Sequence, residues 1–375
     1  MSEIRVNSLG NETNTGGPVL SGITTFSGQK YFIPPKGTTA ERPSGCPPGS
    51  IRFNTDSAHL EYWNGLVWLE FEASSVELGD QNNTNSSGGT GTRAVFMGGQ
   101  KDGTGVFDII DYVTIATLGN AQDFGNLLAS EQEANAFSSS TRGFHFGGDP
   151  ADNEIETFVF SSTGNATDFG DLTATSKTGV GLANATRGIA YLNNGNVINY
   201  VTMAATGTAV DFGDATFSGG AGGMAVSSSV RGVFGGIYVS PAANNTLNYI
   251  TISSTGNAQD FGDLSTTKHS GSGASNPIRG VFMNGYTGSA KTNNIDFITI
   301  STLGNSQDFG DTTAANYYTA GSASSTRMVQ GGGGDPVTNT MDYVEIPTTG
   351  NAIDFGDLTQ DRRHLESCSN GHGGL

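Results

Sequence analysis

The chain has 375 residues, 56 of them glycine, and only 14% are charged. Its 35 acidic and 17 basic side chains give a net charge of −18, which argues against binding to nucleic-acid phosphates or an anionic membrane surface. Two cysteines are too few for a disulfide framework or a zinc motif. Abundant β-branched, aromatic and turn-forming residues predict short strands, and therefore an all-β protein.

Residues 1–75 form a distinct segment in which prolines are concentrated. Residues 50–71 predict three antiparallel strands, with Asn64-Gly65 as a two-residue type I′ turn. A sheet this small needs a partner surface, so we expect homo-oligomerisation, with a trimer preferred. The alternative is packing on the rest of the chain. Residues 76–92 are rich in Gly, Ser and Asn and predict a linker.

The triplet Asp-Phe-Gly occurs six times in the remaining sequence, at intervals of 43 to 49 residues. A kinase uses this triplet once, beside a nucleotide loop and a His-Arg-Asp motif, and the sequence contains neither in the required context. Six copies instead indicate a structural repeat. The copies begin at Asp123, Asp168, Asp211, Asp260, Asp308 and Asp354.

Two further motifs recur in step with this triplet. One is an arginine followed by an apolar stretch, and the other is a segment such as "IDYVTIA". Together with a preceding small-residue segment they predict four strands per repeat, as in the blade of a β-propeller. The arginines are Arg93, Arg142, Arg187, Arg231, Arg279 and Arg327.

Six repeats predict a six-bladed propeller over residues 93–375. The first repeat lacks a leading strand, because "NNTNSSGGTG" precedes Arg93. The last repeat is followed by surplus sequence that contains "LESCSN". We expect this C-terminal segment to supply the missing inner strand of the first blade and so to close the ring.

The apolar–Gly–Gly strand followed by a Tyr-containing strand resembles the kelch repeat, although Phe of Asp-Phe-Gly stands where kelch repeats usually carry Trp. The segments "RVNSLGNETNTGGPVLSG", "YFIPPKGTTAERPSG" and "GSIRFNTDSAHLEYWNGLVWLEF" resemble the N-termini of tail-fibre and related virion proteins of marine cyanobacterial phages. The resemblance implies a trimeric virion protein whose N-terminal module binds other virion proteins and whose distal part contacts the host. The sequence shows no apolar stretch typical of a signal peptide or a membrane span. We therefore expect synthesis in the host cytoplasm, no membrane insertion, and a final location in the virion.

Positions that recur in every repeat serve the blade, whereas variable positions on one face are free to bind a ligand. The variation concentrates in the loops between second and third strands and in the blade-to-blade connections, which leave a blade on the same face. Aromatic and amide groups there suit sugars, and the alternative is that these loops are merely solvated. The candidate binding residues are Asp149, Tyr238, Lys268, His269, Tyr286, Tyr317, Tyr318 and Asp335.

Three interpretations of the paired aspartates in the repeats are possible: a calcium site, a turn and an ion pair. Pairs such as Asp168 and Asp171 could hold Ca²⁺, but two carboxylates per blade fall short of its six to eight oxygens. A turn device, or an ion pair between each such Asp and a repeat arginine, explains them better. No catalytic signature is present, so we expect a protein that is not an enzyme, without metal or cofactor.

Two functional hypotheses remain. The first is a virion fibre whose propeller recognises a host-surface glycan or protein, with avidity from several copies. The second is a structural decoration or adaptor, on the tail or the capsid, that binds only other phage proteins. A carbohydrate-cleaving propeller is a weaker third.

Overall fold

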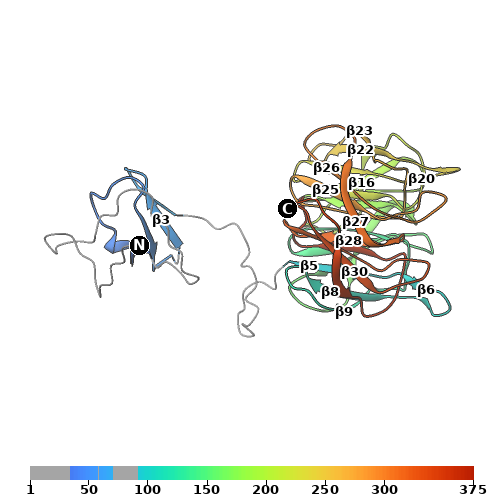
Figure 1. Ribbon diagram of the computed structural model, residues 1–375, viewed down its shortest axis with the longest axis horizontal. Helices are drawn as coiled ribbons and strands as arrows, with labels where there is room; N and C mark the ends of the chain where they lie inside the picture. Colours follow the sequence, from blue (N-terminus) through green and yellow to red (C-terminus); the bar gives the residue numbers. More distant parts are fainter. Residues whose placement is uncertain (1–33, 58, 71–91) are drawn as a thin grey trace, which may run out of the picture. The chain divides into compact units, whose positions relative to one another are not determined.

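The computed structural model describes residues 34–57, 59–70 and 92–375 (Figure 1). The chain divides into two compact units, Met1–Val76 and Glu77–Leu375. The predicted linker, 76–92, lies outside the described residues except for Thr92. In the described residues, no helix has the length and apolarity that crossing a bilayer requires.

The first unit contains a four-stranded sheet. The predicted strands are present as β2 (Ile51–Asn54), β3 (His59–Trp63) and β4 (Trp68–Glu70), and an unpredicted strand, β1 (Lys36–Gly37), pairs in parallel with β2. A short 3₁₀ helix, η1 (Thr39–Glu41), follows β1. The predicted two-residue turn is wrong: Trp63 pairs with Trp68, so the loop has four residues, and the Asn64 side chain accepts two of its backbone N–H groups.

This sheet buries its polar face. Glu61 is fully buried and forms ion pairs with Arg52 (3.1 Å) and Arg42 (2.6 Å). On the opposite face, Ile51 and Leu69 remain 51% and 38% exposed. The apolar side chains therefore lie on the more exposed face of the sheet.

The second unit is built from six antiparallel sheets of four strands each. Sheet 1 is β32 (Glu366–Ser369), β5 (Arg93–Met97), β8 (Ile109–Thr114) and β9 (Gln122–Asn126); sheet 2 is β10 (Asn135–Ser138), β11 (Arg142–Phe146), β12 (Asp152–Val159) and β13 (Thr167–Ser176). Sheet 3 is β14 (Val180–Ala183), β15 (Arg187–Tyr191), β16 (Val197–Thr202) and β17 (Val210–Asp214); sheet 4 is β18 (Met224–Ser227), β19 (Arg231–Gly235), β22 (Thr246–Thr251) and β23 (Gln259–Asp263). Sheet 5 is β24 (Ser272–Ser275), β25 (Arg279–Met283), β26 (Thr292–Thr299) and β27 (Gln307–Asn316); sheet 6 is β28 (Ala320–Ala323), β29 (Arg327–Gly331), β30 (Thr340–Glu345) and β31 (Ile353–Asp357).

Two small hairpins project from the loops between second and third strands. They are β6 (Gln100–Lys101) with β7 (Gly105–Val106) in sheet 1, and β20 (Tyr238–Val239) with β21 (Ala242–Ala243) in sheet 4. In Figure 1 both hairpins lie on the side of the unit opposite the C-terminus.

The predicted role of the C-terminal strand in sheet 1 is confirmed. β32 pairs antiparallel with β5, and Cys368 lies opposite Val95. The sheet thus joins residues more than 270 positions apart in the chain, and its inner strand is the last strand of the protein.

The first strand of each sheet contacts the first strands of its two neighbours, and we call these six the inner strands (β10, β14, β18, β24, β28 and β32). Their contacts run from β10 through β14, β18, β24 and β28 to β32, and from β32 back to β10. The apolar core follows the same order, because each of six buried clusters is shared by two adjacent sheets. The burial of apolar area between sheets therefore stabilises the whole unit.

Each repeat arginine connects its own sheet to the next. Arg231 Nη1 in sheet 4 donates to the carbonyl of Ile300 in sheet 5 (2.8 Å), and its guanidinium lies 4.6 Å from the centre of the Tyr249 ring. All six arginines make the equivalent bond, and the sixth, Arg327, donates to Ile115 of sheet 1. Five of them stack on an aromatic ring. In sheet 2, Thr157 occupies the position equivalent to that ring, two residues before Val159, the register partner of Arg142.

The expected ion pair between these arginines and the Asp-Phe-Gly aspartates is wrong. The only carboxylate that the structure pairs with a repeat arginine among the described residues is Glu345, which binds Arg327. The aspartates lie exposed on the outer strands, while the arginines turn towards the neighbouring sheet. Carbonyl oxygens and ring faces replace the carboxylates as their partners.

The Asp-Phe-Gly triplet forms the outer joint between sheets. In sheet 4, Phe261 is buried in the core, and its carbonyl accepts a bond from Gly304 N–H of sheet 5 (2.9 Å). Gly262 has φ +141°, and a Cβ there would lie 2.5 Å from the Gly304 carbonyl oxygen. The Asn305 side chain accepts the N–H of Asp263 (3.1 Å). The triplet recurs because, in each sheet, its Phe carbonyl and its glycine lie against a turn of the next sheet, where a side chain on the glycine would clash.

Candidate functional site

The two variable loop sets lie side by side at one end of the inner strands. Isolated bridges connect Ala221 with Tyr238 and His269 with Tyr286, in each case a sheet-to-sheet connection with a loop between second and third strands. The expectation that these two loop sets share one face is therefore met in the structure.

These loops surround a cavity of about 670 Å³, which we call the mouth. Its floor is formed by the first residues of all six inner strands, among them Asn135, Val180 and Ser272. The volume lies within the range of roughly 300–1,000 Å³ that small-molecule sites occupy. Tyr238 of hairpin β20–β21 lines the mouth, and this hairpin lies on the side of the unit opposite the C-terminus (Figure 1).

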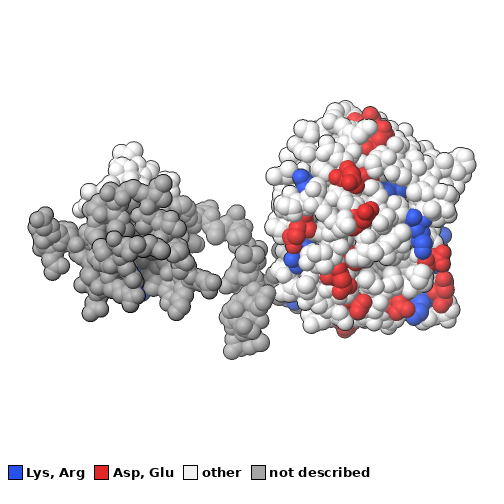
Figure 2. Space-filling view, in the orientation of Figure 1, with Lys and Arg blue, Asp and Glu red and all other residues white. Residues whose placement is uncertain are grey.

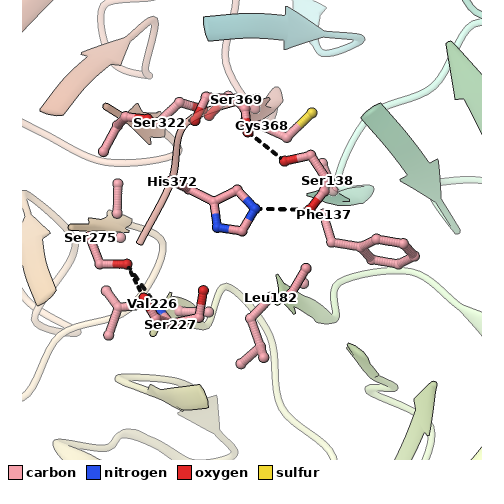
Figure 3. A pocket seen from close by; sticks show the side chains of 18 of the residues that line it. Phe137, Ser138, Leu182, Val226, Ser227, Ser275, Ser322, Cys368, Ser369 and His372 are labelled. Atoms are coloured by element: carbon pink, nitrogen blue, oxygen red, sulfur yellow. Dashed lines mark hydrogen bonds between the residues drawn. The ribbon is translucent and has the colours of Figure 1, made fainter. Parts of the chain in front are cut away.

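The opposite end of the inner strands encloses a space of only about 60 Å³, because the C-terminal residues fill it (Figure 3). His372 Nε2 lies 2.8 Å from the Ser138 carbonyl oxygen, and its Nδ1 accepts the N–H of Gly374 (3.1 Å). Burial lowers the pKa of His372. The neutral imidazole thus has both nitrogens bonded, and this end is closed by the chain itself.

Six aromatic rings form an arc along the mouth. Consecutive centres along the arc lie 3.6 to 5.8 Å apart, and the tightest pair is Tyr318 stacked on His364. The arc runs through Tyr238, His269, Tyr286, Tyr317, Tyr318 and His364, and all six line the cavity. Five of these were sequence candidates, which the structure brings together; His364 was missed.

The residue two positions before each inner strand lies at the mouth, and we call these six the rim residues: Glu133, Thr178, Gly222, Ser270, Tyr318 and His364. Five of them have φ between +56° and +67°, and only one of those five is glycine. Left-handed conformations are unusual for the other four and typical of functional sites.

Backbone hydrogen bonds hold the rim residues in place. Glu133 N–H donates to the His364 carbonyl (2.9 Å), His364 N–H to Tyr318 (3.2 Å), and the series continues through Ser270 to Gly222. The series stops at Thr178, whose hydroxyl instead accepts a bond from Asn193. The rim is thus rigid over five sheets and differs in side chain at each of them.

A group of charged side chains adjoins the His364 end of the aromatic arc. Lys177 Nζ lies 3.2 Å from Asp149 Oδ1 and 3.6 Å from Glu133 Oε2, and Glu133 Oε1 lies 3.2 Å from His364 Nδ1. Burial raises the pKa of Glu133. Burial, with the positive charges of Arg363 and Lys177, lowers the pKa of His364 to about 3, so this imidazole is neutral at physiological pH.

Two sequence candidates lie outside the cavity lining. Asp149 is near the rim but pairs with Lys177 and with Gln132 Nε2 (3.1 Å). Lys268 is wrong as a ligand-binding residue, because its side chain is fully buried: Nζ lies 3.1 Å from Asp296 Oδ2 and donates to Asn294 Oδ1 (3.0 Å). Asp335 does line the mouth, where its carbonyl accepts a bond from Lys291.

A buried acidic cluster lies around His145 of sheet 2 and includes Glu366 of sheet 1. His145 Nε2 is 3.0 Å from Glu366 Oε1 and 3.7 Å from Glu131 Oε2, and all three side chains are buried. Burial alone would lower the pKa of His145, but Glu366, Glu131 and Glu156 together raise it to about 9. Burial, with a hydrogen bond to Asp152, raises the pKa of Glu131 to about 9. The cluster therefore contains an imidazolium and a neutral carboxylic acid at pH 7.

The residues missed from the sequence were Glu133, Thr178, Ser270 and His364. Only their position in the repeat could have identified them. When the repeats are aligned, these residues occupy the same position as Tyr318. Among the described residues, no group of three or more His, Cys, Asp or Glu side chains has an arrangement suited to a metal ion. The arrangement fits a binding site with a rigid rim, an aromatic wall and a floor formed by the first residues of the inner strands.

Comparison of the sequence with protein-family models gives no match, and comparison with curated proteins gives none either.

Proposed function

We propose that the six sheets are the blades of a six-bladed, kelch-like β-propeller, closed by β32. Three observations support this. The contacts between inner strands, the six core clusters and the six arginine bonds each pass from sheet to sheet and return from sheet 6 to sheet 1.

We propose further that the protein is a virion component, of tail-fibre type, whose propeller mouth binds a glycan or protein on the host surface. The observation that carries this proposal is the aromatic arc on a rigid rim around a cavity of about 670 Å³. No residue of the site is assigned a catalytic role.

The position of the chain ends within the propeller agrees with this function. Thr92, where the described part of this unit begins, lies beside Gly371 at the closed end of the inner strands. The first described residue of the propeller therefore lies on the face opposite the mouth.

The N-terminal module is proposed to attach the protein to other virion proteins and to assemble it into a trimer. Support comes from the exposed face of its sheet, where Ile51, Leu60 and Leu69 are 38% to 51% exposed. Light scattering of the full chain measures the oligomer. A trimer that Leu60→Lys dissociates supports the proposal, and a wild-type monomer contradicts it.

Labelling of phage particles with an antibody against the propeller tests the proposed role. We expect label at the distal ends of tail fibres and inhibition of adsorption to the host. Label on the capsid with unimpaired adsorption would instead support the decoration or adaptor function.

A further inference from the structure

The side chains of the mouth allow the ligand class to be narrowed, if the mouth is the binding site proposed above. The aromatic arc offers ring faces from four sheets rather than a single stacking position, with Tyr286 and Tyr317 at its middle (5.3 Å between centres). The apolar C–H face of a pyranose stacks on such rings, while their polar atoms remain available to its hydroxyls.

The basic groups at the mouth already have partners. Lys177 pairs with Asp149 and Glu133, and Lys291 donates to the carbonyl of Asp335. Just outside the cavity, Arg363 pairs with Asp102 (2.7 Å). The two imidazoles of the arc are shifted towards neutrality, because burial lowers the pKa of His269 and of His364. A carboxylate or sulfate would therefore have to break the ion pairs of Lys177 or Arg363, or displace the Asp335 carbonyl from Lys291.

Two buried hydroxyls at the mouth have no partner within the protein. Thr319 is 7% exposed, its Oγ1 makes no hydrogen bond within the protein, and the residue lines the cavity. Ser367, on the adjacent inner strand, also lines the cavity with an unbonded Oγ. Buried hydroxyls normally have partners, so two unpaired ones at a cavity wall point to a ligand that supplies donors and acceptors.

We infer that the mouth binds the end of a neutral saccharide, which stacks on the Tyr286–Tyr317 part of the arc and hydrogen-bonds to the Thr319 hydroxyl. This inference rests on the proposed function and adds the chemical class of the ligand. It distinguishes neutral sugars from uronic, sialylated or sulfated ones, and from a protein epitope.

Saturation-transfer NMR on the full-length protein tests the inference with two sets of probes. The neutral set is methyl galactoside, methyl glucoside, methyl mannoside and N-acetylglucosamine; the acidic set is glucuronate, sialic acid and sulfated galactose. We expect transfer from the protein to at least one neutral sugar and none to the acidic set. Binding of the acidic set alone would overturn the inference.

Three variants link that binding to the mouth. Tyr286→Ala should weaken it about tenfold, the effect of losing one stacking contact. Thr319→Val should weaken sugar binding severalfold and leave the melting temperature unchanged or higher. Loss of a hydroxyl with a purely structural role would instead lower the melting temperature. Tyr343→Ala, an aromatic substitution away from the cavity, is the control and should bind normally when folded. Equal binding by all three variants overturns the inference.

Binding of the same proteins to host cells separates this inference from the proposed function. If cell binding depends on Tyr286 but no neutral sugar binds, the saccharide inference is wrong and the proposed function stands. If cell binding is indifferent to Tyr286, the proposed function is wrong.

Discussion

The outer joint and the rim are formed by the same repeats, but their sequences vary in opposite ways from one repeat to the next. At the joint, all six sheets use Asp-Phe-Gly, because each must accept the turn of its neighbour. At the rim, the six equivalent residues are all different, although a common backbone path holds five of them. Positions with the same residue in every sheet are thus those that hold the sheets together. Positions with different residues on the same backbone path are those whose side chains can serve binding.

The largest effect should come from a side chain placed in the joint. Gly262→Ala brings a Cβ against the Gly304 carbonyl, so we expect a loss of about 3 kcal/mol or more in the free energy of unfolding. Gly304→Ala is the matched control, with a similar φ of +145° but open space around the new Cβ. It should cost about 1 kcal/mol. Denaturant titration measures both, and equal losses would show that the joint is not closely packed.

The arginine bonds between sheets should have a graded effect. Arg231→Leu removes a bond to the Ile300 carbonyl and a cation–π contact, at a cost of about 2 kcal/mol. Arg142→Leu should cost less, because Arg142 makes a longer bond (3.4 Å) and faces no aromatic ring. Chemical denaturation of the two variants checks the order; a reversed order would refute this account of the arginines.

The buried cluster in sheet 2 should make stability depend on pH. Both the His145 and Glu131 pKa values are raised to about 9 in the folded protein, from 6.5 and 4.5. The folded state therefore holds protons that the unfolded state releases, and stability falls as pH rises, from about 4.5 to 9 for Glu131 and from about 6.5 to 9 for His145.

Glu131→Gln tests the carboxyl contribution, since glutamine mimics the neutral acid. Thermal melts from pH 5 to 9 should show a shallower fall for the variant than for the wild type, with a stability gain of about 1 kcal/mol or more at pH 8. Parallel curves would mean that Glu131 is ionised in the fold.

The smallest effect is expected at the rim. Ser270 has φ +56°, and the equivalent position in sheet 4 is already Gly222. Ser270→Gly should raise the free energy of unfolding by up to about 1 kcal/mol, or leave it unchanged if the bond between Ser270 Oγ and His269 Nδ1 (2.8 Å) offsets the gain. A loss above 1 kcal/mol would show that this rim residue serves the fold.

The repeat motifs predicted the strands, the face shared by the variable loops and the pairing of β32 with β5, because these follow from local pattern and from one missing strand. The partners of the arginines could not be predicted, because every residue has a backbone carbonyl and the sequence does not show which one accepts a bond. Lys268 was assigned to the binding face because it lies in a variable connection between repeats, but its side chain is buried in an ion pair with Asp296 of β26. Glu133 and His364 were missed because only their place in the repeat, and not their chemistry, relates them to Tyr318.

Binding of the labelled full chain to cells of the proposed host, a marine cyanobacterium, tests the central claim, that the mouth is the binding site, most directly. The double variant Tyr286→Ala, Tyr317→Ala should lose at least tenfold in affinity, whereas Tyr343→Ala, if it keeps the wild-type fold by circular dichroism, should bind like the wild type. Undiminished binding by the double variant would contradict the claim and place the recognition surface elsewhere on the protein.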